Sequence, residues 1–423
     1  MQRIAIIGSG VSGLVAARDL HHHAEVVLFE ADDRVGGHVN TVEVLEADQS
    51  LGIDTGFIVF NQRNYPGFTA LLDELRVATQ PSEMSFSVSS SVTGLEYCGT
   101  NVNTLLARRS NLIRPSFVRM VSDIPRFNRA ARALLDSDDI TLSLDDFLHR
   151  ENFSRPFIDN YLIPLGAAIW SANPQEFSQF PASSLAQFLD QHGLLSLGHR
   201  PPWRTVVGGA RRYVEALTES IADQIRTRCA VLAVERDDEC VLVRSEARPE
   251  GERFDRVVFA THADTTLALL ASPTARERAV LSAFRFQRNR ATLHTDAHLL
   301  PARRRAWASW NYRRTGDEQR VPVLTYYANR LQDFASVHDY CITLNADEEI
   351  DPAKVIASFE YAHPTFDEAA LRAQRRHHEI DGHDRVHFVG AYWGYGFHED
   401  GVQSALRVAT KVRGADESVL ARR

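Results

Sequence analysis

Residues 4–14 read Ile-Ala-Ile-Ile-Gly-Ser-Gly-Val-Ser-Gly-Leu, and this stretch decides the fold. The apolar run at 4–7 is typical of a buried parallel strand, and three glycines with GxGxxG spacing then lead into a helical pattern over 14–20. In such a turn the first glycine permits a tight bend, the second lets backbone approach a pyrophosphate, and the third lets the helix pack on the strand. The helix N-terminus would then face the phosphates.

A second apolar run at 25–29 ends at Glu30, which lies 22 residues beyond Gly8 (30 − 8). An acidic side chain at the tip of the second strand is what would hold a ribose hydroxyl. A glycine-rich turn alone is weak evidence, but this context predicts dinucleotide binding. The residues expected at the dinucleotide are Gly8, Gly10, Val11, Ser12, Gly13 and Glu30.

Length and composition set broad limits on the function. The chain has 423 residues, of which 44% are hydrophobic and 24% charged, as in ordinary globular proteins. The net charge of −8 gives no reason to expect nucleic-acid binding. The four cysteines are scattered, so neither a disulfide framework nor a metal site is expected, and a reducing cytoplasm is predicted. The chain begins with a strand, without a predicted signal peptide, and no apolar run approaches the ~18 residues of a membrane-spanning helix.

The next motif points to a particular dinucleotide. Residues 34–38, Arg-Val-Gly-Gly-His, resemble the R-x-G-G motif of the flavin amine oxidase and phytoene desaturase superfamily of FAD-dependent oxidoreductases. In that superfamily the glycine doublet passes close to the FAD pyrophosphate, and the next residue is often arginine, where this chain has His38. The resemblance therefore implies FAD as cofactor. It assigns to the cofactor Ala31, Arg34, Gly36, Gly37 and His38, and it places Gly56 and Phe57 near the flavin ring.

The C-terminal part carries the superfamily's second FAD signature. A strand at 385–389 is followed by a glycine-containing loop and a helix that reaches about residue 412. Asp400 is the predicted N-cap of that helix, and in relatives this first turn faces the flavin edge, where reduction develops negative charge. Most members have an acidic residue where this chain has Ala391. The resemblance further assigns to the cofactor Val231, Ala260, Gly390, Gly401 and Val402.

Between these motifs the pattern changes. Helices are predicted over 65–75, 116–135, 144–150, 183–192 and 211–226, a hairpin over 84–97, and antiparallel strands over 291–295, 306–312, 323–327 and 340–344. We therefore predict an α/β fold with a Rossmann-type FAD-binding domain, whose doubly wound sheet is mostly parallel, and a discontinuous α+β substrate domain. The predicted FAD domain comprises residues 1–60, 200–286 and 375–423, and the predicted substrate domain comprises 61–199 and 287–374.

The helix at 116–135 has two interpretations. One face is apolar and the remainder carries arginines, which suits an interfacial helix on an anionic membrane. The preferred interpretation is an ordinary amphipathic helix that covers a core and carries solvated arginines. Pro125 is expected to interrupt this helix. Peripheral contact with the inner face of the membrane stays open.

The resemblance is greatest to a bacterial branch of amine-oxidase-like proteins associated with modified fatty acids. It implies dehydrogenation of a hydrophobic substrate, such as the acyl chain of a lipid, with hydride transfer to flavin N5 and reoxidation by oxygen or another acceptor. No second GxGxxG is present, so no NAD(P)H domain is expected. Amine oxidation is the alternative, although relatives usually place a lysine beside N5 and the strand at 291–295 has none. A purely structural use of FAD is the third possibility.

Three aromatic residues of the C-terminal signature are the candidate catalytic residues, namely Tyr392, Trp393 and His398. Rings in such loops often only pack, so this assignment competes with a structural role. His294, on the strand at 291–295, is expected to be a hydrogen-bonded strand histidine and not a base.

Overall fold

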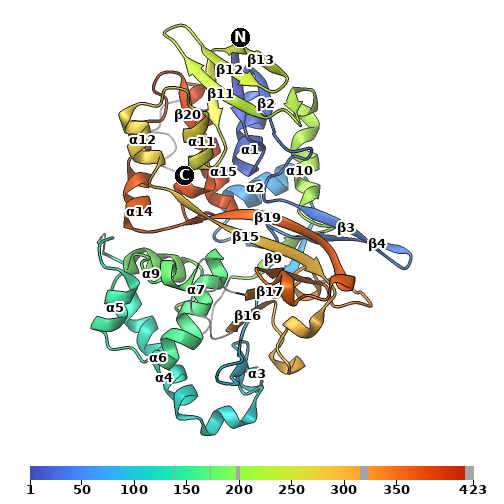
Figure 1. Ribbon diagram of the computed structural model, residues 1–423, viewed down its shortest axis with the longest axis vertical. Coiled ribbons are helices and arrows are strands. Elements are labelled where there is room, and N and C mark those ends of the chain that lie inside the picture. Colours follow the sequence, from blue (N-terminus) through green and yellow to red (C-terminus); the bar gives the residue numbers. More distant parts are fainter. Residues whose placement is uncertain (138, 172, 197–200, 315–322, 415–423) are drawn as a thin grey trace.

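The computed structural model describes residues 1–137, 139–171, 173–196, 201–314 and 323–414. Figure 1 shows two layered regions joined by the long strands β15 (Arg285–His294) and β19 (Val355–Thr365), which cross the middle of the molecule. One region is built around a parallel sheet. The other combines a mixed sheet with a group of helices (Figure 1).

The parallel sheet has the strand order β10-β2-β1-β14-β20. Its strands are β1 (Gln2–Ile7), β2 (Ala24–Phe29), β10 (Ile225–Arg226), β14 (Arg256–Phe259) and β20 (Val386–Phe388). Ile4 and Ile6 of β1 join a core with the helices on one face, and Ala5 and Ile7 join a second core on the other face. Burial on both faces explains why this strand reads as a continuous apolar run.

Helices cover one face of this sheet and a small antiparallel sheet covers the other. The helices are α1 (Val11–Leu20), α2 (Pro66–Glu74), α10 (Arg211–Thr218) and α15 (His398–Val412). The small sheet consists of β11 (Val231–Arg236), β12 (Val241–Ser245) and β13 (Arg248–Phe254). The two ends of the chain thus meet, because α1 and α15 pack against each other.

The mixed sheet has seven strands in the order β19-β15-β18-β17-β16-β7-β8. Besides β15 and β19 it contains β7 (Phe86–Ser90), β8 (Glu96–Cys98), β16 (Trp310–Arg314), β17 (Val323–Tyr327) and β18 (Cys341–Leu344). Further short strands are β3 (Thr41–Glu46), β4 (Gln49–Asp54), β5 (Phe60–Asn61), β6 (Thr79–Ser82) and β9 (Trp203–Val206).

The second region is mostly helical at its far end. Its helices include α3 (Val102–Leu105), α4 (Pro115–Arg132), α5 (Leu144–Arg150), α7 (Ile163–Trp170), α8 (Pro174–Phe177) and α9 (Ala182–Gln191), together with the 3-10 turns η1 (Arg109–Ile113) and η5 (Arg304–Ala306). The predicted interruption at Pro125 is wrong, since α4 continues through it. The proline ring lies on the exposed side of the helix, where the lost backbone hydrogen bond is least costly.

Other differences from the predicted elements have local causes. The helix predicted over 211–226 ends at Thr218 and continues as a 3-10 segment, because β10 begins at Ile225. The strand predicted over 306–312 begins only at Trp310. The sequence pattern missed β19, which pairs with β15 along its whole length.

All five strands of the parallel sheet come from the segments predicted as the FAD-binding domain, and residues 197–200 and 415–423 lie outside the described residues. The domain division itself stays a prediction. Among the helices that the structure describes, none has both the length and the apolar character needed to cross a membrane.

Candidate functional site

The glycine turn at residues 8–13 connects β1 to α1 as predicted. Glu30 reaches it from the end of β2, and one carboxylate oxygen of Glu30 accepts hydrogen bonds from the backbone N–H of Ser9 (2.9 Å) and from its hydroxyl. A Cβ on Gly13 would overlap the carbonyl of Gly8, so only glycine lets the helix start this close to the strand. A Cβ on Gly10 would meet no heavy atom within 4 Å, which leaves this backbone open to a bound group.

The glycine doublet packs directly on this turn. A Cβ on Gly37 would lie 3.0 Å from the Cα of Gly10, and Gly36 donates its N–H to the carbonyl of Ser9 at 2.9 Å. Arg34 supports the doublet from behind, because its guanidinium donates to the carbonyls of Gly37 (2.9 Å) and Val39. The two motifs, separated by over twenty residues, therefore form one backbone surface.

The C-terminal signature completes this surface. A Cβ on Gly401 would lie 2.7 Å from the side chain of Val11 and 2.8 Å from the hydroxyl of Ser12, so the side chains in the first turn of α1 pack directly on the backbone of α15. Val402 is buried in the same core, and Gly390 donates its N–H to Ser404 at 3.2 Å. Two helix N-termini thus converge on the glycine turn, which suits an anionic ligand.

The prediction that Asp400 is the N-cap of this helix is wrong. The helix begins at His398, and Asp400 in its first turn accepts the backbone N–H of Phe397 at 2.9 Å. Burial raises the pKa of Asp400 to about 7. The neighbouring Glu399 accepts the N–H groups of Gly67 and Phe68, each at 2.9 Å, and so caps α2.

The loop at 54–57 runs beside the doublet. Phe57 donates its N–H to the carbonyl of His38 at 3.0 Å, and a Cβ on Gly56 would overlap that carbonyl. Asp54 is fully buried and accepts hydrogen bonds from Thr41 and the backbone of Ala210. Burial raises the pKa of Asp54 to about 7.

Three further predicted residues lie around the glycine turn, near the ends of β14, β11 and β2. Ala260 follows β14, donates its N–H to Ile7 at 2.8 Å and contacts Gly13. Val231 opens β11, two residues after Cys229 donates its N–H to the carbonyl of Glu30 at 2.8 Å. Ala31 is exposed beside Glu30. These positions are compatible with the predicted roles, which stay predictions.

The predicted catalytic residues are not gathered at one point. His398 stacks on Phe57 with ring centroids 3.5 Å apart, and its Nε2 is 3.0 Å from the hydroxyl of Tyr213. Burial lowers the pKa of His398 to about 3. Tyr392 and Trp393 instead pack against Phe284, at 4.9 and 5.0 Å between ring centroids. His398 therefore lies nearest the convergent motifs.

The structure adds a cluster that sequence reasoning missed. His38 lies 5.9 Å from His262 and 5.4 Å from His363 between ring centroids, and it stacks on Tyr361 at 5.2 Å. The side-chain amide of Asn289 lies 2.9 Å from Nδ1 of His363. Burial lowers the pKa of His363 to about 4 and that of His38 well below its ordinary value, so this cluster is neutral at pH 7.

The cluster depends on the pairing of β15 with β19, which no sequence motif marks. Tyr361 ties β19 to the doublet region, because its hydroxyl lies 2.8 Å from that of Thr55 and accepts from Asn40 at 3.0 Å. The one available signal was His38 itself, at the position where relatives often carry arginine.

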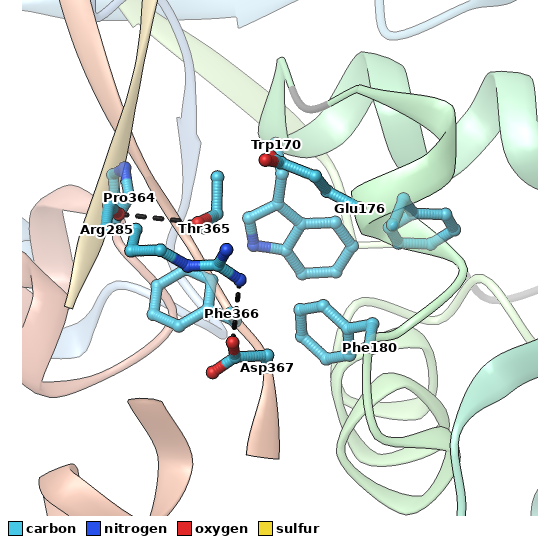
Figure 2. A pocket seen from close by; sticks show the side chains of 9 residues that line it. Trp170, Glu176, Phe180, Arg285, Pro364, Thr365, Phe366 and Asp367 are labelled. Carbon is cyan, nitrogen blue, oxygen red and sulfur yellow. Dashed lines mark hydrogen bonds and ion pairs between the residues drawn. The ribbon is translucent and has the colours of Figure 1, made fainter. Parts of the chain in front are cut away.

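A small cavity of about 10 Å3, enough for about one water molecule, lies where the helical region meets β19. Figure 2 shows Trp170, Phe180 and Phe366 on its walls and the guanidinium of Arg285 directed at Asp367, 2.7 Å away. A second cavity, of about 430 Å3, shares Glu176, Arg285 and Thr365 with the first and extends along β15 to Phe286 and Asp264. Phe286 stacks on His262 at 4.3 Å, which links this cavity to the histidine cluster.

Comparison with known proteins identifies the family. The family model for flavin containing amine oxidoreductases matches residues 11–308. The chain belongs to this family. Its cofactor is FAD, and the protein is an FAD-dependent oxidoreductase. The open backbone at Gly10 and the convergent helix N-termini fit that cofactor.

The individual relatives have low sequence identity to this chain. A lysine-specific histone demethylase 1B homolog of Caenorhabditis elegans is 24% identical over 290 residues, covering 61% of this chain and 32% of its own length. The chain spans less than two thirds of the curated relatives that it matches. Putrescine oxidase in complex with putrescine (16% identity, TM-score 0.70, 98% and 99% coverage) and a fatty acid isomerase from P. acnes (14%, 0.70, 97% and 98%) share the fold.

Proposed function

We propose that this flavoprotein dehydrogenates a hydrophobic substrate, specifically the acyl chain of a lipid. The observation that carries the proposal is the aromatic cavity formed by Trp170, Phe180 and Phe366, which continues along β15 toward His262 and His38. Substrate cavities are mostly apolar with few polar groups, and the second cavity, of about 430 Å3, falls in the usual range of about 300–1,000 Å3.

The acid–base groups of the site also favour this reaction. Amine-oxidase relatives usually place a lysine beside flavin N5, but both lysines of this chain are engaged in ion pairs. Lys354 pairs with Asp296 and Lys411 with Asp381, each at 3.0 Å. The buried histidines are neutral, and Asn289 presents an amide beside them on β15. Neutral buried imidazoles, which can accept a proton, suit removal of hydrogen from a hydrocarbon.

The chain's own residues would position the substrate. Bound FAD supplies an acceptor for hydride at N5, with reoxidation by oxygen or another acceptor. The aromatic rings at Trp170 and Phe366 would align the acyl chain and exclude water. The proton lost from the adjacent carbon needs a neutral base, and the buried histidines of the cluster, His38, His262 and His363, are the candidates among the described residues.

Amine oxidation is the second candidate, and one observation favours it. The two cavities have three carboxylates on their lining, Glu176, Asp264 and Asp367, against the single cation Arg285. Such a rim would attract a substrate ammonium group. The fold neighbour crystallised with putrescine is an amine oxidase, although its identity of 16% carries no substrate assignment.

Anaerobic mixing separates the two functions. Purified FAD-loaded protein is combined with unsaturated or methylated acyl phospholipids, and separately with amines, while flavin absorbance near 450 nm is followed. We expect bleaching by the lipids. Bleaching by amines alone would overturn the proposal in favour of amine oxidation.

A cavity-filling variant makes this test specific. Phe180→Trp should slow lipid-driven bleaching about tenfold or more, because it narrows the aromatic cavity. Phe334→Trp, at a phenylalanine that packs against a different hydrophobic core and lines neither cavity, is the matched control and should leave the rate unchanged. Equal rates for both variants would exclude this cavity as the substrate site.

A further inference from the structure

An exposed apolar patch lies at the end of the molecule farthest from the small antiparallel sheet, at the lower edge of Figure 1 where α3, η1 and the start of α4 lie. Twelve large apolar side chains are exposed among the described residues, and five of them gather here. We call them the tip patch: Val92, Val102, Leu112, Ile113 and Val118. Ile113 is 85% exposed and Leu112 is 60% exposed, so neither side chain belongs to a hydrophobic core. Exposed apolar patches of this kind commonly mark interaction sites.

Three of the four segments that carry the tip patch are tied together. Arg114 donates to the carbonyl of Thr93 at 3.1 Å and Arg108 donates to that of Gly94, so η1 is fastened to the turn that carries Val92. Arg109 donates to Asn103 at 2.7 Å and so fastens η1 to α3.

Hydrogen bonds also fix the direction in which the patch points. The buried side chain of Asn111 donates to the carbonyl of Glu96 at 3.1 Å, and Pro115 sets the start of α4 directly afterwards. The turn therefore anchors its polar residue inward and holds Leu112 and Ile113 outward. A chance loop would gain free energy by turning these apolar side chains inward.

The charge around the patch is strongly positive. Residues 99–122 contain four arginines and no acidic residue, although the whole chain has a net charge of −8. Three more arginines, at 303–305, lie alongside, because the N–H of Ala302 is bound by Glu96 of β8 at 2.7 Å. Arg303 pairs with Glu96 and Arg304 with Asp339, and positive charge stays in excess around the patch. Exposed apolar side chains surrounded by arginines are the combination that binds anionic bilayers.

We propose that the tip patch docks this protein on an anionic lipid bilayer, with Leu112 and Ile113 inserted and the surrounding arginines on lipid phosphates. The body of α4 takes no part. Arg126 pairs with Asp123 at 2.7 Å and Arg132 donates to the carbonyl of Leu195, so these arginines hold the helical region together. The inference does not depend on which substrate the flavin site accepts.

Vesicle sedimentation tests the docking with the full-length FAD-loaded protein. Vesicles of phosphatidylcholine alone are compared with vesicles containing 30% phosphatidylglycerol. We expect binding to the anionic vesicles only, with an affinity that falls as salt rises. Leu112→Ser combined with Ile113→Ser should lower the partition coefficient about tenfold or more, and Arg109→Gln combined with Arg305→Gln should lower it about fivefold per arginine.

The matched control is Leu45→Ser, which alters an 84% exposed leucine on the β3–β4 hairpin and should leave binding unchanged. Unchanged flavin absorbance in every variant verifies folding. Wild-type protein that fails to bind anionic vesicles, or tip variants that bind as well as wild type, would overturn the proposal. Binding to an oligonucleotide but not to vesicles would assign the arginines to a nucleic acid and would overturn it as well.

Discussion

Single glycines form the predicted cofactor surface, because each stands where another segment of the chain packs closely. Gly37 meets the backbone of Gly10, and Gly401 meets the side chains of Val11 and Ser12, although these residues are far apart in sequence. The resemblance of the motifs predicted that all would serve FAD, but their mutual contact is a property of the folded chain.

Gly401 gives the sharpest residue-scale prediction. Gly401→Asp should abolish flavin retention, since its Cβ would lie 2.7 Å from Val11 and its carboxylate would add negative charge at the two helix N-termini. The ratio of flavin to protein absorbance after purification measures this. Gly99→Asp is the control, because a Cβ there would meet only one atom, at 3.9 Å, and a fully flavinylated Gly401→Asp protein would contradict the placement.

His398 permits a second prediction at this scale. Its ring stacks on Phe57 and its Nε2 contacts Tyr213. The substitution His398→Ala would therefore remove a buried ring beside the convergent motifs without changing the glycine turn. We expect FAD retention with substrate-driven flavin reduction slowed at least tenfold. Trp393→Phe, in the packed cluster with Phe284, should change the reduction rate less than threefold. If both variants reduced the flavin equally slowly, His398 would have no more effect on the reaction than Trp393, and the prediction would be wrong.

At the scale of elements, the interlock between α15 and α2 is the least expected feature. Glu399 in the first turn of α15 accepts both N–H groups at the start of α2. Glu399→Ala should therefore lower the free energy of unfolding by about 1–2 kcal/mol, as measured by urea denaturation of the FAD-bound protein. Glu25→Ala, which removes an exposed ion pair with Arg3, should cost less than about 1 kcal/mol. A loss at Glu399 no larger than at Glu25 would show that the cap is dispensable.

Elements that follow local patterns could be predicted from the sequence. The apolar run of β1, the turn into α1 and the hairpin of β7 and β8 were predicted correctly, because turn chemistry and side-chain periodicity fix them. Elements fixed by distant partners could not be predicted. β19 alternates too weakly to be read as a strand and forms because β15 lies beside it. Asp400 has an ideal N-cap side chain, yet the helix begins earlier, with Glu399 already engaged at α2.

At the scale of the whole molecule, the histidine cluster illustrates the same limit for the site. His38 comes from the doublet loop, His262 follows β14, and His363 lies on β19. Only the complete fold brings these rings together, and burial then lowers their pKa values. The histidine cluster is therefore a product of tertiary structure, whereas the predicted cofactor surface is encoded in short motifs.

Buried titratable groups couple the stability of the whole molecule to pH in two opposite directions. His294 accepts the N–H of Asp296 at Nδ1 (3.0 Å) and its Nε2 lies 2.7 Å from the hydroxyl of Thr343, so it is held neutral, and burial lowers its pKa to about 4. The unfolded chain then binds more protons below pH 6.5, and stability falls on acidification. Asp54, whose pKa is raised to about 7, works oppositely, because the folded chain takes up its proton first.

Urea unfolding at pH 7.5 and 5.5 separates these two contributions. Between pH 7.5 and 5.5 the free energy of unfolding should drop by about 1.4 kcal/mol less in His294→Gln than in wild type. A histidine whose pKa falls from 6.5 in the unfolded chain to about 4 in the folded chain contributes roughly that amount over the interval. Asp54→Asn should lose more than wild type, since the stabilising protonation of Asp54 is gone. His149→Gln, which changes an exposed histidine on α5, is the control and should follow wild type. Shifts in the same direction for His294→Gln and Asp54→Asn would refute the assigned protonation states, because the sign of each shift depends only on which form of the side chain the fold buries.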